Sequence, residues 1–143
     1  KSGGFNVPFG RYNNPTICDS GRLMTCSAAL QNVTLAHGDF MGVEERAKSG
    51  DFVYFDPPYV PLNATSSFTS YTRDGFTIDD QIRLRDLALR LKENGVHVLL
   101  SNSSAEVIRE LYSPKFNVKE VMASRSINSK ASGRGKVAEL LMW

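Results

Sequence analysis

The sequence predicts an α/β fold with a mostly parallel β-sheet. Two short apolar runs, Phe52–Phe55 and Val96–Leu100, have the pattern of strands that are buried on both faces of a sheet. Between them lies Ile78–Asn94, whose apolar residues recur at helical spacing. A strand, a helix and a second strand in this order are typical of a parallel sheet with helical connections.

The composition agrees with a single globular domain. Of the 143 residues, 41% are hydrophobic and 22% are charged, and 17 Lys+Arg against 15 Asp+Glu give a net charge of +2. These values exclude a disordered or fibrous chain, and no apolar run in the sequence approaches the roughly 18 residues that a membrane span needs. The two cysteines, Cys18 and Cys26, lack the spacing of a metal or redox site. They could form one disulfide, but two thiols in a chain of this composition are more often reduced, as in the cytoplasm.

The first part of the chain differs in amino-acid composition from the rest. Residues 1–32 are rich in Gly, Asn, Ser and Pro and predict surface loops, with a short helix at Leu23–Leu30. Val33–Ala36 is a short apolar run and predicts the first strand. A brief helix is expected over Met41–Lys48, before the buried strand Phe52–Phe55.

The clearest helix is Ile78–Asn94. Thr77 is its predicted N-cap, and Asp79 and Asp80 lie in the first turn, where carboxylates interact favourably with the helix dipole. Gly95 can take the left-handed conformation that commonly ends a helix.

The C-terminal third predicts one more helix and two more strands. Ser103-x-x-Glu106 has the form of a capping box and predicts a helix over Ala105–Tyr112. Phe116–Met122 alternates weakly as a strand, and Val137–Met142 is a second apolar run, after the polar and basic segment Ser124–Lys136.

Polar residues follow three of the predicted strands. They are Gly38-Asp39-Phe40, Asp56-Pro57-Pro58-Tyr59 and Ser101-Asn102. In open α/β sheets the functional crevice lies at the carboxyl ends of the strands. The second group is the most informative, because two prolines stop a strand abruptly and hold the following residues in one extended shape.

The Asp-Pro-Pro-Tyr group suits a planar ring that carries an amino group. The Asp56 carboxylate and the Pro57 carbonyl can each accept one N–H of an exocyclic amine, and Tyr59 can stack on the ring. Two such hydrogen bonds localise the nitrogen lone pair and direct it out of the ring plane, where it can attack a sulfonium methyl group in line. The alternative is a rigid turn in which Asp56 is a turn former and Tyr59 is a packing residue.

A buried strand followed by Asp-Pro-Pro-Tyr resembles the catalytic motif of the amino-group DNA methyltransferases, which use S-adenosylmethionine. Phe5–Tyr12 (FNVPFGRY) closely resembles a segment of the DNA-recognition region of the Dam-type DNA adenine methyltransferases. Further strings similar to this family are Phe68–Tyr71, Phe76-Thr77, Ser101-Asn102, Arg125–Ser129 and Val137–Leu141. The resemblance implies a Rossmann-like, S-adenosylmethionine-dependent methyltransferase fold.

The resemblance also implies roles for individual residues. Asp56, Pro57, Pro58 and Tyr59 correspond to the catalytic tetrapeptide. Asp39 and Phe40 fall where the family contacts the adenine of the cofactor, and Asp56 also adjoins it. No metal is implied. Arg11 corresponds to an arginine that reads a guanine of the target, and Pro8 and Tyr12 would lie at the same DNA surface.

Positive charge is concentrated near the C-terminus. Between Lys115 and Lys136 there are six positive residues against one negative residue. We interpret part of this set as phosphate contacts: Arg125, Lys130, Arg134 and Lys136. Without the family resemblance, an ordinary solvated loop is an equally good interpretation of these residues.

The resemblance covers the C-terminal part of such an enzyme. Residues 1–32 correspond to part of the DNA-recognition region, and residues 33–143 to the C-terminal part of the catalytic domain. The Phe-x-Gly-x-Gly loop with which family members hold the methionine moiety of the cofactor does not occur in the sequence. We therefore expect the 143-residue chain alone to be inactive.

The resemblance implies methylation of adenine N6 in double-stranded DNA, with the adenine flipped out of the duplex and GATC as the target. It places such an enzyme in the cytoplasm of a bacterial or phage-infected cell. Asp56 favours adenine, because cytosine-N4 enzymes more often carry Ser at this position. Two alternatives remain open, namely a cytosine-N4 methyltransferase and a non-catalytic DNA-binding remnant.

Overall fold

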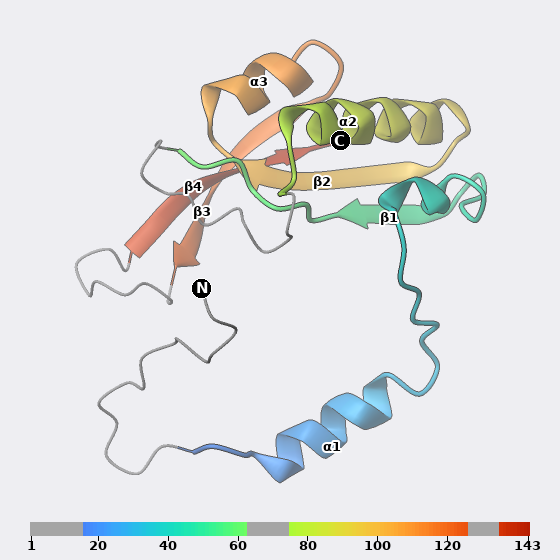
Figure 1. The fold of residues 1–143 in the computed structure, drawn as a ribbon, viewed down its shortest axis with the longest axis vertical. Coiled ribbons are helices and arrows are strands. Elements are labelled where there is room, and N and C mark those ends of the chain that lie inside the picture. The colour runs from blue at the N-terminus through green and yellow to red at the C-terminus, as the bar shows by residue number, and fades with distance from the viewer. Residues whose placement is uncertain (1–15, 63–74, 126–134) are drawn as a thin grey trace. The chain divides into compact units, whose positions relative to one another are not determined.

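The computed structural model describes residues 16–62, 75–125 and 135–143 (Figure 1). The chain divides into two compact units between His37 and Gly38. In the first unit, α1 spans Ser20–Ala29, and the Asp19 carboxylate caps it by accepting a hydrogen bond from the Arg22 backbone N–H. The predicted helix at Leu23–Leu30 is therefore present, and it begins earlier because Asp19 supplies the cap.

The predicted strand Val33–Ala36 is wrong. These residues are irregular, and the side chains of Val33 and Leu35 are 50% and 80% exposed. A strand needs a neighbouring strand to satisfy its backbone N–H and C=O groups. Within the described residues this segment pairs with none, so its apolar run alone does not make it a strand.

The second unit contains a four-stranded sheet in the order β1-β2-β4-β3. Its strands are β1 (Phe52–Phe55), β2 (His97–Ser103), β3 (Val118–Arg125) and β4 (Gly135–Met142). Strand β1 pairs with β2 in parallel, whereas β4 pairs with both β2 and β3 in the antiparallel direction. The sheet is mixed, and the prediction of a mostly parallel sheet is wrong.

The short connection between β3 and β4 explains this difference. A parallel pair needs a crossover connection of about a dozen residues or more, usually with a helix. Only residues 126–134 separate β3 from β4, and consecutive strands joined so closely pair in the antiparallel direction. The Rossmann-like assignment rests on the resemblance and stays a prediction.

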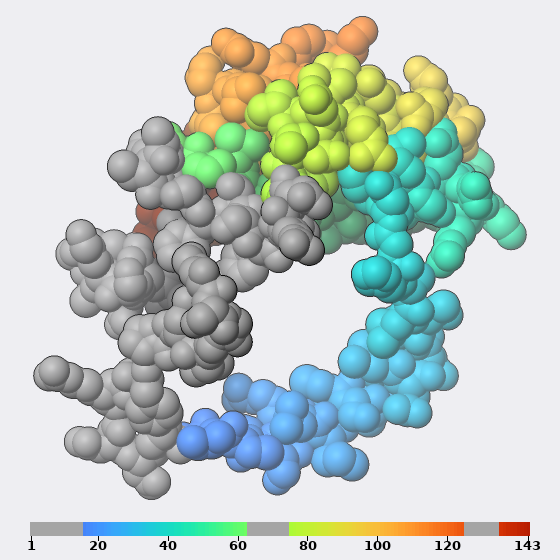
Figure 2. Space-filling model, in the orientation of Figure 1, coloured from blue at the N-terminus to red at the C-terminus, as the bar shows by residue number. Residues whose placement is uncertain are grey.

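The α-helices that the structure describes in the second unit, α2 and α3, pack on the same face of the sheet (Figure 1). Helix α2 spans Ile78–Glu93 and α3 spans Glu106–Tyr112, and they contact each other, as the yellow-green and orange surfaces in Figure 2 show. A 3-10 helix, η1 (Phe40–Val43), contacts α2 and takes the place of the longer helix expected at Met41–Lys48. The buried core comprises chiefly Leu84, Leu87, Leu91, Leu100, Ile108, Leu140 and Met142.

The predicted ends of α2 are confirmed. The Thr77 hydroxyl accepts from the Asp80 backbone N–H, and the Asp80 carboxylate accepts from the Thr77 backbone N–H, which is a complete capping box. Gly95 follows the helix with φ of 79°. A Cβ at Gly95 would lie 2.5 Å from the Ser49 hydroxyl oxygen, so this position favours glycine for space as well as for backbone conformation.

The predicted capping box of α3 is wrong. Ser103 is the last residue of β2, and its hydroxyl accepts from the Ala105 backbone N–H at 3.4 Å. Ala105 is the N-cap and makes no side-chain cap bond. The sheet holds Ser103 in extended conformation, and this pairing outweighs the local capping signal.

The alternate residues of the strands point to the other face of the sheet. On β1, Phe55 faces the core, whereas Phe52 and Tyr54 are 65% and 50% exposed. Trp143, directly after β4, is also exposed.

In the described parts of the chain, no helix is long and apolar enough to cross a membrane.

We expect Leu87→Ala to lower the free energy of unfolding by about 2–5 kcal/mol, because it leaves a cavity in the core. Leu87 is fully buried on α2. Ile78→Ala is the matched control, since Ile78 lies on the same helix with its side chain 42% exposed, and we expect a change within about 0.5 kcal/mol. Urea unfolding of the two variants measures both values, and equal losses would contradict the assignment of the core.

Candidate active site

The Asp-Pro-Pro-Tyr group begins where β1 ends. Asp56 follows Phe55 directly, and the neighbouring parallel strand β2 carries Ser101 and Asn102 near its own carboxyl end. Two of the three predicted groups of polar residues are thus brought together at one edge of the sheet, after the arrowhead of β1 in Figure 1. Strand β2 continues to Ser103, so Ser101 and Asn102 belong to the strand itself and immediately precede its last residue.

The carboxylate of Asp56 is exposed, but one of its oxygens accepts a hydrogen bond from a buried serine. The hydroxyl of Ser101 donates to Oδ1 of Asp56 at 2.9 Å. The phenol of Tyr54 donates in turn to the Ser101 oxygen at 2.8 Å. Ser101 is 2% exposed, so this hydroxyl is shielded from water while the carboxylate that it holds faces outward.

A buried group of three polar side chains holds the backbone of the same loop. Gln81 donates from Nε2 to the Pro58 carbonyl at 3.3 Å, and the Asn102 side-chain oxygen accepts from the Val60 backbone N–H at 3.2 Å. Asn102 also donates to the Gln81 side-chain oxygen at 3.1 Å. The Tyr112 phenol donates to the Gln81 backbone carbonyl at 3.3 Å. Buried polar groups that satisfy one another in this way make a rigid support.

Sequence reasoning assigned no role to Gln81 or Tyr112. A signal for Gln81 was present, because it occupies the same helical face as Leu84, Ala88 and Leu91. A polar residue at a core position of an amphipathic helix needs a hydrogen-bond partner. Burial raises the pKa of Tyr112, so its phenol keeps the proton that it donates to Gln81.

Tyr59 is held on the other side of the loop by β4. Its phenol donates to a carboxylate oxygen of Glu139 at 3.4 Å. Partial burial is the main reason that the pKa of Tyr59 is raised to about 12. A hydrogen bond with the Ser101 side chain lowers this pKa, whereas the carboxylates of Glu139 and Asp56 raise it further. The phenol is therefore neutral at physiological pH. Glu139 lies in an apolar run of the sequence, where reasoning from the pattern did not single it out.

The loop presents the three groups that its sequence predicts. The Asp56 carboxylate is exposed, the Tyr59 ring is half-buried, and no donor among the described residues reaches the Pro57 carbonyl. Two acceptors and an aromatic ring next to each other in the chain can bind the amino group and the face of a planar base.

Asp39 and Phe40 lie at η1 and not at the end of a strand, because the residues before them are irregular. Asp39 caps η1 by accepting from the Met41 backbone N–H at 2.9 Å, and it accepts from the Arg83 guanidinium at 3.1 Å. These two donors, the backbone N–H first, lower the pKa of Asp39. The Arg83 guanidinium also lies over the Phe40 ring, 5.1 Å from its centroid, and the ring of Phe76 packs against that of Phe40.

The proposed DNA-binding residues are only partly within the described residues. Pro8, Arg11, Tyr12, Lys130 and Arg134 lie outside them. Arg125 is the last residue of β3, and Lys136 is exposed near the start of β4, so the paired strands bring these two positions to the same end of the sheet.

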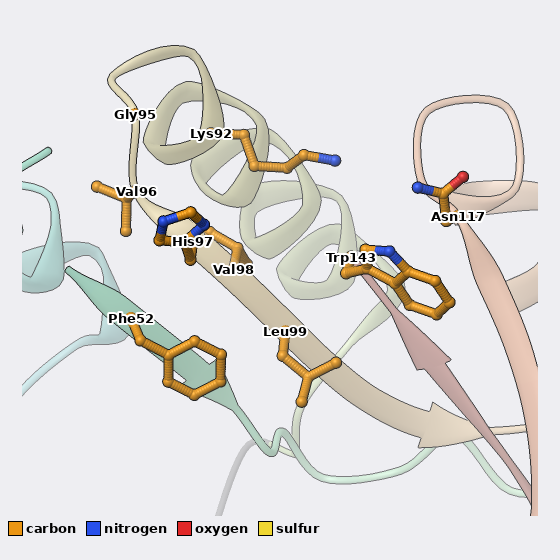
Figure 3. Close-up of a pocket in the computed structure, with 9 residues that line it drawn as sticks. All are labelled: Phe52, Lys92, Gly95, Val96, His97, Val98, Leu99, Asn117 and Trp143. Carbon is orange, nitrogen blue, oxygen red and sulfur yellow. The ribbon is translucent and has the colours of Figure 1, made fainter. Parts of the chain in front are cut away.

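A hollow of about 590 Å³ lies elsewhere, at the amino ends of β1 and β2. Figure 3 shows Phe52 and Leu99 on its floor, with Lys92 of α2 and the terminal Trp143 beside them. Asp56 follows the carboxyl end of β1, which is the opposite end of that strand. The hollow is therefore separate from the Asp-Pro-Pro-Tyr site.

A carboxylate and an aromatic ring thus lie together directly after the carboxyl end of β1. Residues 1–127 match the family of D12 class N6 adenine-specific DNA methyltransferases, and the chain belongs to this family.

Known relatives agree with this assignment. The chain is 48% identical over 140 residues to the Type II methyltransferase M1.LlaDCHI of Lactococcus lactis, covering 96% of this chain and 49% of the relative. It is 50% identical over 135 residues to the Type II methyltransferase M.MjaIII of Methanocaldococcus jannaschii, covering 94% and 46%. It is 38% identical over 139 residues to the DNA adenine methylase of Escherichia coli, covering 97% and 49%. The chain thus spans about half the length of the curated relatives it matches.

Proposed function

We propose that the chain is the C-terminal part of an enzyme that methylates adenine N6 in DNA, with S-adenosylmethionine as the methyl donor and GATC as the target. The observation that carries this proposal is the Asp56 carboxylate, exposed at the end of β1 and held by Ser101 beside Tyr59, in a chain of an adenine-specific family. The name DNA adenine methylase, which several relatives bear, supports the choice of base.

Each residue of the Asp-Pro-Pro-Tyr loop would have a separate role in binding the adenine. An adenine flipped out of the duplex would stack on Tyr59, with its two amino hydrogens donated to the Asp56 carboxylate and the Pro57 carbonyl. These bonds localise the nitrogen lone pair and direct it out of the ring plane. The nitrogen would gain the methyl group as the bond between that carbon and the sulfonium sulfur breaks, and it would lose one proton, with Asp56 next to the hydrogen that is lost. Pro57 and Pro58 fix the spacing between the carboxylate and the ring.

S-adenosylmethionine supplies an electrophilic methyl group when it is bound. We assign Asp39 and Phe40 to its adenine, because a carboxylate and an aromatic ring suit an amino-substituted ring. Arg83 of α2 orders both of these residues, and Gln81, two positions earlier, holds the Asp-Pro-Pro-Tyr loop. The first turns of α2 therefore support both halves of the proposed site.

DNA is the proposed macromolecular partner. We assign residues 1–32 to the DNA-recognition region and residues 33–143 to the C-terminal part of the catalytic domain. Arg11 would read a guanine, Pro8 and Tyr12 would lie beside it, and the C-terminal basic residues would contact phosphates. The enzyme would act in the cytoplasm of a bacterial or phage-infected cell.

A non-catalytic DNA-binding remnant is the second candidate. The observation that favours it is that no Phe-x-Gly-x-Gly loop occurs in the 143-residue sequence. The reading frame upstream of Lys1 distinguishes the two candidates, because an encoded glycine-rich loop after a strand supports the enzyme.

The test of the function is the identity of the methylated base. The polypeptide that contains this chain is incubated with isotope-labelled S-adenosylmethionine and a duplex that carries one GATC, and the nucleosides are separated by mass spectrometry. We expect N6-methyladenine, and no label in a duplex in which both central A·T pairs are replaced by G·C pairs. N4-methylcytosine would contradict the choice of base, and unlabelled DNA would favour the remnant.

Arg11→Ala should weaken discrimination at one base pair of the target by about 1–3 kcal/mol, because a bidentate contact to guanine is lost. Lys136→Ala is the matched comparison, since it removes one positive charge that we assign to a phosphate. It should weaken binding to all sequences alike and reduce the slope of affinity against salt concentration. Binding to duplexes with single base changes, measured at several salt concentrations, separates the two effects. A uniform loss in both variants would contradict the assignment of Arg11.

A further inference from the structure

The structure contains a chain of hydroxyl groups that ends at the Asp56 carboxylate. Tyr54 on β1 and Ser101 on β2 lie on neighbouring parallel strands, and Ser101 bridges Tyr54 and Asp56 with bonds of 2.8 Å and 2.9 Å. A serine hydroxyl has only one hydrogen, and an ionised carboxylate only accepts. The Ser101 hydrogen is therefore directed at Asp56, and its lone pair receives the hydrogen of Tyr54.

This arrangement distinguishes the two oxygens of the carboxylate. Of the two carboxylate oxygens, Oδ1 of Asp56 accepts the hydrogen bond from Ser101. The terminal torsion of an aspartate is broad, so the carboxylate needs a fixed donor to hold it in one orientation. Ser101 is 2% exposed and so is itself held by its surroundings, and a hydrogen bond to an ionised group is stronger than a neutral one.

We propose that Ser101 and Tyr54 are positioning residues, which turn the Asp56 carboxylate so that Oδ2 faces the amino group of the target base. This proposal rests on the proposed function. Tyr54 acts through Ser101, because its phenol fixes the hydroxyl rotor of that serine. The pair acts on the reacting group and not on DNA affinity, since neither residue lies in the segments that we assign to DNA contacts.

The test is a set of variants in the methylating enzyme that contains this chain: S101A, S101T, Y54F and the double variant Y54F/S101A. S101A should lower kcat about 10- to 100-fold with KM for duplex DNA changed less than about twofold, because a misplaced reacting group affects rate more than binding. S101T keeps the hydroxyl and should restore most of the rate. S113A, which removes an exposed serine hydroxyl at the end of α3, is the matched control and should leave kcat unchanged.

The double variant tests whether Tyr54 acts on Asp56 through Ser101. If Tyr54 acts only through Ser101, Y54F should lower kcat in the parental enzyme but cause no further loss in the S101A background. Losses that multiply would overturn the role of Tyr54. A parental kcat in S101A, or a loss of rate that only follows a lower melting temperature and that S101T does not restore, would overturn the role of Ser101.

A crystal structure of S101A provides a readout that does not depend on methylation. We expect the Asp56 carboxylate to occupy more than one orientation there, in contrast to a single one in the parental protein. A single, unchanged orientation would overturn the proposal. If the parental enzyme methylates cytosine, or no base, the proposed function is overturned instead. In that case the orientation of Asp56 in the two crystal structures would still decide whether Ser101 positions this carboxylate.

Discussion

Asp56→Ala should lower the rate of adenine methylation by at least about 10³-fold, while the affinity for DNA changes little. The substitution removes the carboxylate that accepts an amino hydrogen and stabilises the positive charge that develops on the nitrogen, and the loss of one such group typically costs two to three orders of magnitude or more. Single-turnover methylation of a GATC duplex gives the rate, and fluorescence anisotropy gives the affinity.

Two further variants make this result specific. Asp56→Asn keeps the shape but replaces one acceptor with an N–H₂ donor, which opposes the amino group of the base, so we expect a loss similar to that of the alanine variant. Asp79→Ala removes an exposed carboxylate from the first turn of α2 and should leave the rate unchanged. A near-parental rate in Asp56→Ala would refute the catalytic assignment.

The isolated polypeptide of residues 1–143 should bind S-adenosylmethionine negligibly and should not methylate DNA. The proposed site for the target base lies in this chain, but its sequence contains no Phe-x-Gly-x-Gly segment, in which the absence of a Cβ would let the backbone approach a ligand closely. Some weak, salt-sensitive binding to DNA should remain, because the basic residues are present.

Isothermal calorimetry with the cofactor measures this directly, and a thermal shift provides a second reading, because a ligand that binds the native state raises the melting temperature. Micromolar affinity for a monomer would contradict the prediction. It would mean that Asp39, Phe40 and other residues of this chain are sufficient to hold the cofactor without the glycine-rich loop.

Local patterns in the sequence were sufficient for the elements that surround the site. The strand Phe52–Phe55, the helix after Thr77 and the Asp-Pro-Pro-Tyr loop were predicted from short stretches, because apolar spacing, capping residues and prolines act within a few residues. The position of Asp56 and Ser101 at one edge of the sheet agrees with the rule that functional residues follow the carboxyl ends of strands, but their hydrogen bond was not predicted.

The remainder depends on partners that are distant in sequence. Val33–Ala36 has the composition of a strand but pairs with no strand among the described residues, and Ser103 was read as a cap although pairing with Glu139 holds it in β2. The roles of Gln81 and Tyr112 come from contacts over more than 20 residues of chain, as the separations of 23 and 31 residues show. No local pattern reports such contacts, and the direction of β4 in the sheet is decided by the connection before it.

The position of β4 has a consequence for the order in which the protein is made. This strand lies between β2 and β3, and its residue Glu139 holds Tyr59, which precedes it by 80 residues. On the ribosome, the loop with Asp56 and Tyr59 emerges long before its partner, and β2 and β3 emerge without the strand that joins them. A nascent chain therefore exposes the site residues before β4 is available to pair with β2 and β3 and to hold Tyr59.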